Sequence, residues 1–430
     1  MRLPILPIVV TAVLVTALLL GGAWLLLAPR GPALTQASLS LAAISPNADG
    51  NQDVTRITYT LRRPASVSIY FVNAQGQRFD FRVDQPRDSG QHQVDFSGIV
   101  SPYSLPGDKY TAALLARVLQ DGDYTWVIEA RDPASSSGPS GRITGTLKIA
   151  DADVTLPDLT HFTANPSIFT PNQDGLSDRA QINVWLDKDV APDGLRVDLI
   201  GPTGADIPIA EQISSIQRGQ RGLHQYNYDG GIDLGQNPPP NGLYTVRASV
   251  EDRLGQKMAV TTTLTIKDGG LPRAEILNGE VKFSATTLQL GQTLYFTLTV
   301  ENYGNSPIRT SGPPSGTIYK SMGENANTLG DYEQSGVFRA GIMCQTCKSD
   351  FPWRWALGTP DTLSKTVDEN GYTQYYLLPG QRATITGGVV LDQIVESRNP
   401  QNFWAGLIHE DVEVVNNGVD PQAITIVANQ

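Results

Sequence analysis

The chain has 430 residues, enough for about three domains of roughly 100 to 200 residues each. Only 17% of the residues are charged, and 41 Gly and 29 Pro separate short runs of Val, Thr and Ile, which favours several all-β modules over a helical enzyme. The 32 basic and 43 acidic residues give a net charge of -11, which argues against binding to a phosphate backbone. We therefore predict no nucleic-acid partner.

The N-terminal segment predicts a membrane anchor. Residues 8–27 carry no charge, and as a helix they would reach about 30 Å, the thickness of a bilayer core. This run is longer than the apolar core of a usual signal peptide, so we expect an uncleaved anchor within residues 1–30, followed by a spacer at 31–39. A cleaved signal stays open, because small residues follow in GPALTQA. The expected location is a single-pass membrane protein with its C-terminal domains outside the cytoplasm.

Alternating apolar and polar residues predict strands in the next two blocks, residues 40–150 and 151–269. TRITYTL at 55–61 and SVSIYF at 66–71 each place apolar side chains on one face, as a two-sheet sandwich requires.

Three landmarks return in the same order in both blocks, which indicates one fold used twice. SPNADGNQD returns as TPNQDGLSD, SGQHQVDFSG as RGLHQYNYDG, and DGDYTWVIEARD as NGLYTVRASVED. The blocks differ in one spacing, because 23 residues separate Gly98 from Gly122 and only 11 separate Gly230 from Gly242. We expect the extra piece to form a hairpin or a short helix.

These landmarks resemble the immunoglobulin-like repeat of the flagellar hook-capping protein FlgD and the related C-terminal domains of gliding-associated surface proteins. The resemblance covers about residues 40–268 and rests on the order P-N-x-D-G-x-x-D, strand, turn with Gly, then N/D-G-x-Y-T. It implies an immunoglobulin-like sandwich that serves as a structural or cell-surface module and brings no catalytic residues. The first block departs from the family pattern W-D-G, since it has Phe96, Ser97 and Gly98 there.

The repeated opening motif leaves two interpretations open, a backbone turn or a calcium site. Alternate oxygen side chains with Gly at the sixth position resemble a calcium loop, but the twelfth position is Arg56 in one copy and Gln181 in the other, where a bidentate Glu is needed. Asn and Asp side chains also close turns by themselves, and Gly accepts a positive φ, so we favour the turn. The residues concerned are Asn47, Asp49, Asn51, Asp53, Asn172, Asp174 and Asp178.

The third block, residues 270–430, contains a long insertion at about 320–376 that carries both cysteines. Its short motifs E-N-x-G-N-x-P-I and P-G-Q resemble bacterial adhesion-type immunoglobulin-like domains. Cys344 and Cys347 predict a local disulfide, since a zinc site would have only His409 as a distant third ligand, and a redox site would need a βαβ context.

Aromatic residues alternate beside these cysteines at Phe351, Trp353 and Trp355. They could form a recognition surface for a glycan or a protein, because rigid rings give large contact areas at low entropic cost. They could equally pack inside the insertion, which we favour because exposed aromatic patches are uncommon. Either way, this loop is the first place to expect a ligand.

The sequence shows no catalytic motif, and its four histidines are scattered, so we predict a non-catalytic protein. The expected architecture is all-β, with three consecutive immunoglobulin-like sandwiches after an N-terminal transmembrane helix. The expected function is a structural, adhesive or protein-binding module of the bacterial cell envelope, with a surface protein as its partner. The alternatives are an assembly scaffold for a surface apparatus and a glycan-binding or enzymatic module centred on the aromatic loop.

Overall fold

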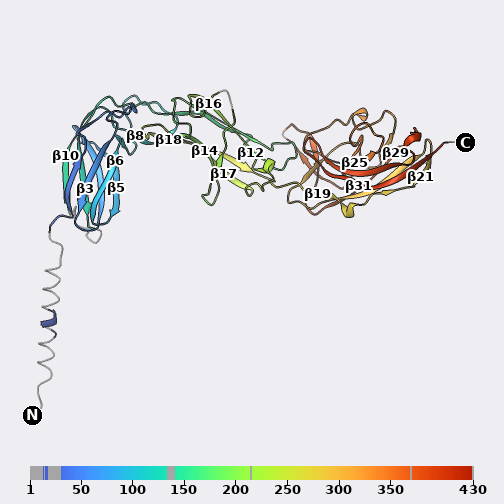
Figure 1. Ribbon diagram of the computed structural model, residues 1–430, viewed down its shortest axis with the longest axis horizontal. Helices are drawn as coiled ribbons and strands as arrows, with labels where there is room; N and C mark the ends of the chain where they lie inside the picture. The colour runs from blue at the N-terminus through green and yellow to red at the C-terminus, as the bar shows by residue number, and fades with distance from the viewer. Residues whose placement is uncertain are drawn as a thin grey trace, which may run out of the picture. The chain divides into compact units, whose positions relative to one another are not determined.

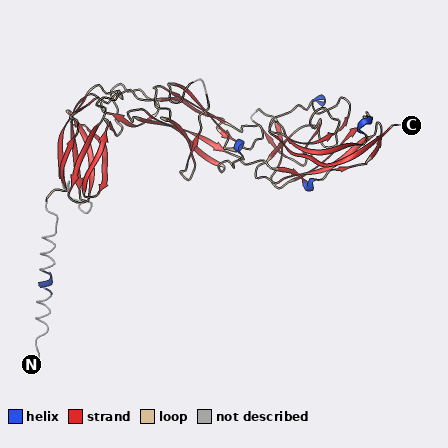
Figure 2. Cartoon of the chain, viewed as in Figure 1, coloured by secondary structure: helices blue, strands red, loops and turns tan. Residues whose placement is uncertain are grey.

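The computed structural model describes residues 31–132, 141–213, 216–368 and 370–428, together with Val13 and residues 15–17. In this part of the chain the regular structure is almost entirely β-strand (Figure 1, Figure 2). The predicted all-β class is therefore confirmed.

The predicted membrane location is wrong for the part of the chain that the structure describes. A span needs about 20 consecutive apolar residues in one helix. No helix among the described residues is both long enough and apolar enough for this. The anchor itself, predicted at residues 8–27, lies almost wholly outside the described residues.

The first repeat, residues 34–149, is built from two sheets and an inserted hairpin. Its core includes Phe71 and Phe96, whose rings stack at 4.2 Å. The smaller sheet has the order β1 (Leu34–Leu39), β3 (Thr55–Leu61), β6 (Gly90–Phe96). The larger sheet has the order β2 (Ala43–Ile44), β10 (Gly141–Ile149), β9 (Gly122–Arg131), β4 (Ala65–Asn73), β5 (Arg78–Arg87).

The second repeat, residues 159–266, has the same strand order as the first. Its smaller sheet runs β11 (Leu159–Asn165), β13 (Ala180–Leu186), β16 (Gly222–Tyr228). Its other strands run β12 (Ile168–Phe169), β18 (Lys257–Ile266), β17 (Gly242–Glu251), β14 (Leu195–Ile200), β15 (Asp206–Ile209), and a 3-10 turn, η1, spans Ile232–Leu234. In both repeats the short second strand pairs in parallel with the last strand. The strand order thus repeats along with the sequence landmarks.

The extra piece of the first repeat is a hairpin, one of the two forms that the sequence predicts. Its strands β7 (Ile99–Val100) and β8 (Ala113–Val118) pair antiparallel, with Ile99 opposite Val118. Strand β8 also pairs with the start of β18, where Lys257 lies opposite Ala116.

The third module, residues 274–427, packs two larger sheets around one core and carries a small three-stranded sheet. Alternation along Thr293–Asn302 buries every second side chain against this core. The first sheet contains β19 (Ala274–Ile276), β20 (Lys282–Phe283), β22 (Thr293–Asn302), β24 (Ile318–Lys320) and β29 (Arg382–Val390). The second contains β21 (Thr287–Gln289), β25 (Phe338–Cys344), β26 (Trp353–Ala356), β30 (Gln401–His409) and β31 (Glu413–Val427). The small sheet contains β23 (Ile308–Thr310), β27 (Ser364–Val367) and β28 (Thr373–Leu377), and 3-10 turns span Leu277–Gly279 (η2), Asn327–Leu329 (η3) and Glu396–Arg398 (η4).

Packing divides the chain into two compact units. One contains the residues up to Asp158 with 188–194 and 250–259, and the other contains 159–187, 195–249 and 260–430. In the first unit Lys188 Nζ lies 2.8 Å from an Asp153 oxygen and 2.7 Å from an Asp252 oxygen. The second unit holds the opening loop of the second repeat together with the whole third module.

Candidate functional site

The opening loop of the first repeat is a turn closed by one carboxylate. Asp53 Oδ1 accepts hydrogen bonds from the backbone N–H groups of Asn47 and Ala48, at 3.1 and 3.0 Å, and its Oδ2 accepts one from Gly50 at 2.7 Å. Asn47 Oδ1 accepts from the Asp49 N–H at 3.0 Å, which is the side-chain turn expected of this residue type. The Asp53 oxygens, which a calcium ion would need, thus already face three N–H donors.

The second loop is closed by one carboxylate in the same way, although one of its three donors is Asp174, which corresponds to Asp49 and not to Ala48. Asp178 Oδ1 accepts from the N–H groups of Asn172 and Asp174, and its Oδ2 accepts from Gly175 at 2.6 Å. Both loops also place three residues at positive φ in equivalent positions: Ala48, Gly50 and Gln52 in one, and Gln173, Gly175 and Ser177 in the other. This geometry is that of the predicted turn. Among the described residues, no group of three or more His, Cys, Asp or Glu side chains is placed to hold a metal ion.

The two loops differ in their surroundings, because only the second packs against the third module. Asp174 is 5% exposed, and its Oδ2 accepts a hydrogen bond from the Tyr376 hydroxyl at 3.1 Å. His409 Nε2 donates to the Gln173 carbonyl at 2.8 Å. In the first repeat the corresponding Asp49 is exposed. We call the contact between residues 170–178 and the third module the joint.

Two glycines allow the backbones of the joint to meet. A Cβ on Gly175 would lie 2.0 Å from the Ser335 carbonyl oxygen, and a Cβ on Gly336 would lie 2.2 Å from the Asp174 carbonyl carbon. Both glycines also have positive φ, 81° and 77°, which side chains disfavour. No other residue type fits either position without moving the backbone.

Burial shifts the pKa values of the ionisable groups in the joint. Loss of solvent, together with the nearby Asp178 carboxylate, raises the pKa of Asp174 to about 6, although the Arg309 guanidinium acts in the opposite direction. Loss of solvent lowers the pKa of His409 to about 4, so this imidazole is neutral near pH 7. The joint therefore holds its histidine neutral and its aspartate partly protonated in mildly acidic solution.

Buried charges support the joint from inside the third module. Arg339 is 0% exposed and lies 3.5 Å from a Glu410 oxygen, and Arg354 contacts the other oxygen of Glu410 at 2.6 Å. Gly336 N–H donates to the Glu410 carbonyl at 2.9 Å, which fixes the backbone that meets the second loop. Sequence reasoning missed this network, because its members are far apart in the chain and match no motif. His409 belongs to the joint and not to a site with the cysteines.

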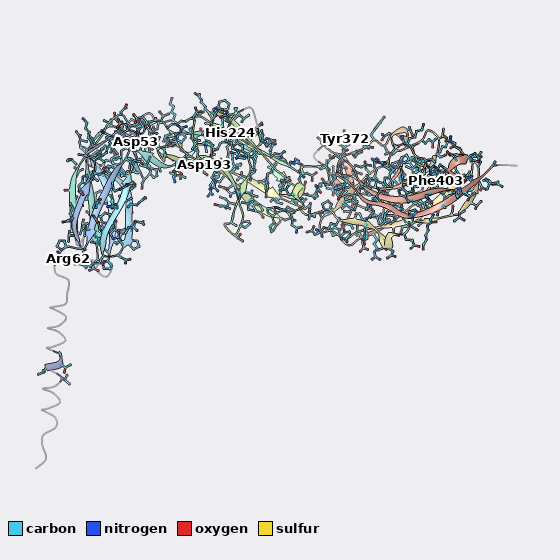
Figure 3. All side chains as sticks on the ribbon, in the orientation of Figure 1. Asp53, Arg62, Asp193, His224, Tyr372 and Phe403 are labelled. Atoms are coloured by element: carbon cyan, nitrogen blue, oxygen red, sulfur yellow. A yellow bond between two sulfur atoms is a disulfide. The ribbon has the colours of Figure 1, made fainter. Side chains whose placement is uncertain are left out.

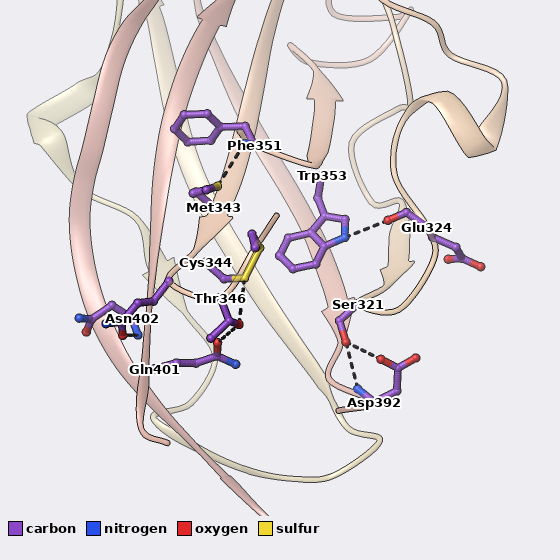
Figure 4. Close-up of a disulfide and its surroundings, with 12 residues drawn as sticks. Ser321, Glu324, Met343, Cys344, Thr346, Phe351, Trp353, Asp392, Gln401 and Asn402 are labelled. Atoms are coloured by element: carbon purple, nitrogen blue, oxygen red, sulfur yellow. Dashed lines mark hydrogen bonds between the residues drawn. A yellow bond between two sulfur atoms is a disulfide. The ribbon is translucent and has the colours of Figure 1, made fainter. Parts of the chain in front are cut away.

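The predicted disulfide is present. Cys344 ends β25, and its sulfur is bonded to that of Cys347. Around the bond, Thr346 Oγ1 donates to Gln401 Oε1 at 2.6 Å, and Gln345 Oε1 accepts from the Asn402 N–H at 3.4 Å (Figure 4). These bonds tie the disulfide turn to the start of β30.

A cleft of about 330 Å³ opens beside this disulfide. Its walls combine the two cysteines with apolar, polar and charged groups, and Met322 at its edge is 55% exposed. Opposite, the Ser321 hydroxyl and the Asp392 carboxylate hydrogen-bond to each other and tie the loop after β24 to the end of β29 (Figure 4). The further lining residues include Glu324, Thr346, Lys348, Trp353, Gln393, Gln401 and Phe403.

The aromatic residues beside the disulfide are buried. Phe351, Trp353 and Trp355 are 3%, 3% and 0% exposed. Trp353 Nε1 donates to the Glu324 carbonyl at 3.1 Å, and Trp355 Nε1 donates to the Thr317 carbonyl at 3.0 Å. Phe403 likewise lies among the core side chains of the third module (Figure 3). This arrangement corresponds to the packing interpretation, because none of the three rings Phe351, Trp353 and Trp355 offers an exposed face on which a sugar could stack.

No protein-family model matches the chain. No curated protein matches it either. Among solved structures it is similar to a DUF4785 family protein from Legionella pneumophila, with 11% identity, a TM-score of 0.23, and coverage of 90% of this chain and 85% of the other. It is also similar to a tetra-tandem repeat from the extending region of a large adhesion protein, with 13% identity, a TM-score of 0.19, and coverage of 88% and 81%. A third similar structure belongs to a 1.5-MDa bacterial ice-binding adhesin, with 13% identity, a TM-score of 0.18, and coverage of 93% and 100%. Similarities at these scores carry no argument about function.

Proposed function

We propose that this protein is a non-catalytic, protein-binding structural module made of three consecutive immunoglobulin-like sandwiches, with boundaries near residues 40–150, 151–269 and 270–430. The joint is the observation that carries this proposal. The opening loop of the second repeat contacts the third module through Asp174 and Gly175, and Gly336 is the close backbone contact on the other side. A fixed arrangement of sandwiches serves to hold binding surfaces at set positions.

The buried ionisable groups also favour a structural role. Glu410 pairs with both Arg339 and Arg354, and Arg354 also pairs with Glu333. The carboxylates of the opening loops accept hydrogen bonds from backbone N–H groups. A catalytic acid or base needs to reach a substrate, whereas these groups are occupied by the fold.

The disulfide cleft is the proposed contact with a protein. It combines exposed Met322 with the charged Glu324 and Lys348, a mixture of apolar and polar groups that suits a protein surface.

Site-specific photo-crosslinking tests this proposal. A photoreactive amino acid replaces Met322 in the cleft, and in a matched control it replaces Tyr295 on β22, which is 50% exposed on the same module. We expect discrete protein adducts from the source cells with Met322 and not with Tyr295. Identical adducts at both positions, or none at Met322, would contradict protein binding at this cleft.

A further inference from the structure

A second and larger cleft lies beside the edge strand β15 of the second repeat. Its volume is about 810 Å³, and its lining is mainly apolar. One wall is the turn between β14 and β15 with Ile207, and the other is the loop between β16 and β17, which carries Leu234 and three consecutive prolines, Pro238 to Pro240. Leu234 lines the cleft and is 80% exposed, so its side chain is accessible to a bound partner.

The register of the strands identifies the same place in the first repeat. Phe79 lies opposite Phe71 in the β4–β5 pair, as Ile207 lies opposite Leu199 in the β14–β15 pair. The turns match as well, since each is closed by hydrogen bonds between the residues at its two ends. Ile207 therefore corresponds to Phe79.

A tyrosine is the second common landmark. The Tyr124 hydroxyl donates to the carbonyl of Gln120 at 2.9 Å, and the Tyr244 hydroxyl donates to the carbonyl of Pro240 at 2.7 Å. Each tyrosine is the third residue of its strand, β9 or β17, and its acceptor lies four residues earlier in the preceding loop. Tyr244, which lines the cleft, therefore corresponds to Tyr124.

In the first repeat the inserted segment fills this place with an aromatic ring. The Tyr103 ring lies 4.8 Å from the Phe79 ring, in an edge-to-face contact, and Phe79 is 4% exposed. The segment also pairs with the edge strand, because the Ser101 N–H donates to the Asp80 carbonyl at 2.8 Å. The second repeat has no such insertion, and Ile207 remains partly exposed.

We propose that the cleft beside β15 binds an extended segment of a partner protein that carries an aromatic side chain, with the ring placed on Ile207 as Tyr103 is placed on Phe79. Tyr244 lines the same cleft, and its counterpart Tyr124 contacts the Phe79 ring. Aromatic rings supply the large apolar contact that such a cleft offers, and an extended backbone can follow the edge strand. This inference rests on the proposed protein-binding function and names the chemistry of one partner, at a site separate from the disulfide cleft.

The cleft also indicates which ring it accepts. In the first repeat the Tyr103 hydroxyl donates to the Val118 carbonyl at 2.6 Å and accepts from the Gln120 N–H at 3.1 Å. Pro240 replaces Gln120 in the second repeat and has no N–H to donate. A phenylalanine in the partner should therefore bind about as well as a tyrosine.

The test uses the full chain and a fluorescent synthetic peptide with the sequence of residues 99–107, IVSPYSLPG, measured by anisotropy. Forms with phenylalanine and with alanine at the tyrosine position are measured in parallel. The variant Leu234→Asp alters the cleft edge, and Leu243→Asp is its control, because Leu243 is 63% exposed in the same repeat and does not line the cleft.

We expect the tyrosine and phenylalanine peptides to bind the unaltered chain saturably, and the alanine peptide to bind it about tenfold more weakly or worse. Leu234→Asp should weaken binding of the tyrosine peptide by about tenfold or more, and Leu243→Asp should leave it unchanged. The absence of saturable binding, or equal binding of all peptides to all variants, would overturn the inference. Because the crosslinking test reports on the disulfide cleft alone, a failure here is distinguishable from a failure of the proposed function.

Discussion

The substitution Gly336→Ala tests the joint, because it changes one backbone contact and leaves the core intact. A Cβ at this position would lie 2.2 Å from Asp174, closer than non-bonded atoms can approach, so the second loop must move away. The expected decrease in the free energy of unfolding has two parts. An alanine at positive φ costs about 1 to 2 kcal/mol. The hydrogen bonds of Asp174 with Tyr376 and of His409 with Gln173 contribute about 1 kcal/mol each, so the total is about 3 to 4 kcal/mol.

Gly330→Ala is the matched control, since Gly330 has a φ of 91° in the same module and nothing within 4 Å of a new Cβ. It should lower the free energy of unfolding only by the strain of an alanine at positive φ, about 1 to 2 kcal/mol. The assay is limited proteolysis of the linker at residues 267–272, with thermal unfolding of the same samples. We expect rapid linker cleavage in Gly336→Ala and cleavage like that of the unaltered chain in Gly330→Ala. Equal cleavage of the two variants would refute the reasoning.

Three further predictions concern pH, calcium and the disulfide. The pKa of Asp174 is raised to about 6 in the joint, so protonated Asp174 stabilises the joint in acid, and this contribution is lost as the pH rises through about 6. The lost contribution to the free energy of unfolding is up to about 3 kcal/mol, and Asp174→Asn should remove this pH dependence. The pKa of His409 is lowered from 6.5 to about 4, so its contribution is present above about pH 6.5 and is lost progressively as the pH falls toward 4, which opposes the Asp174 effect between pH 5 and 8. Linker cleavage at pH 5 and 8 is therefore compared between the unaltered chain and Asp174→Asn, and the same pH dependence in both proteins would argue against the Asp174 assignment. The turn interpretation predicts that calcium and chelators leave the melting temperature unchanged, while Asp53→Asn lowers the free energy of unfolding by about 1 to 3 kcal/mol. A calcium-dependent rise in melting temperature that Asp53→Asn abolishes would instead establish an ion site. Reduction of the bond between Cys344 and Cys347 should cost only about 2 kcal/mol, because the closed loop is short, and a denaturant titration that shows a much larger loss would contradict this.

Local patterns in the sequence predicted the repeated fold and its opening turn. Alternation along 55–61 and the return of the same landmarks are properties of neighbouring residues, and they correspond to the matching strand orders of the two repeats. The disulfide was also predictable, because its cysteines are three residues apart.

The joint and the larger cleft depend on information that no short pattern carries. Asp174 meets Tyr376 across 202 positions, and His409 meets Gln173 across 236, so nothing near either loop distinguishes the buried copy from the exposed one. The cleft beside β15 exists because an insertion is missing, and its significance appears only when Ile207 is placed against Phe79 in three dimensions. Hydropathy suggested a membrane location, which the described helices do not support.

The most direct test of the account is a distance measurement between spin labels on the second repeat and the third module. Leu243→Cys and Tyr295→Cys place labels at exposed positions on the two sides of the joint, and the native cysteines are already bonded to each other. The account predicts a narrow distance distribution in the unaltered joint and a broad one after Gly336→Ala. Equally broad distributions in both proteins would contradict the claim that the repeated loop fixes the second repeat to the third module.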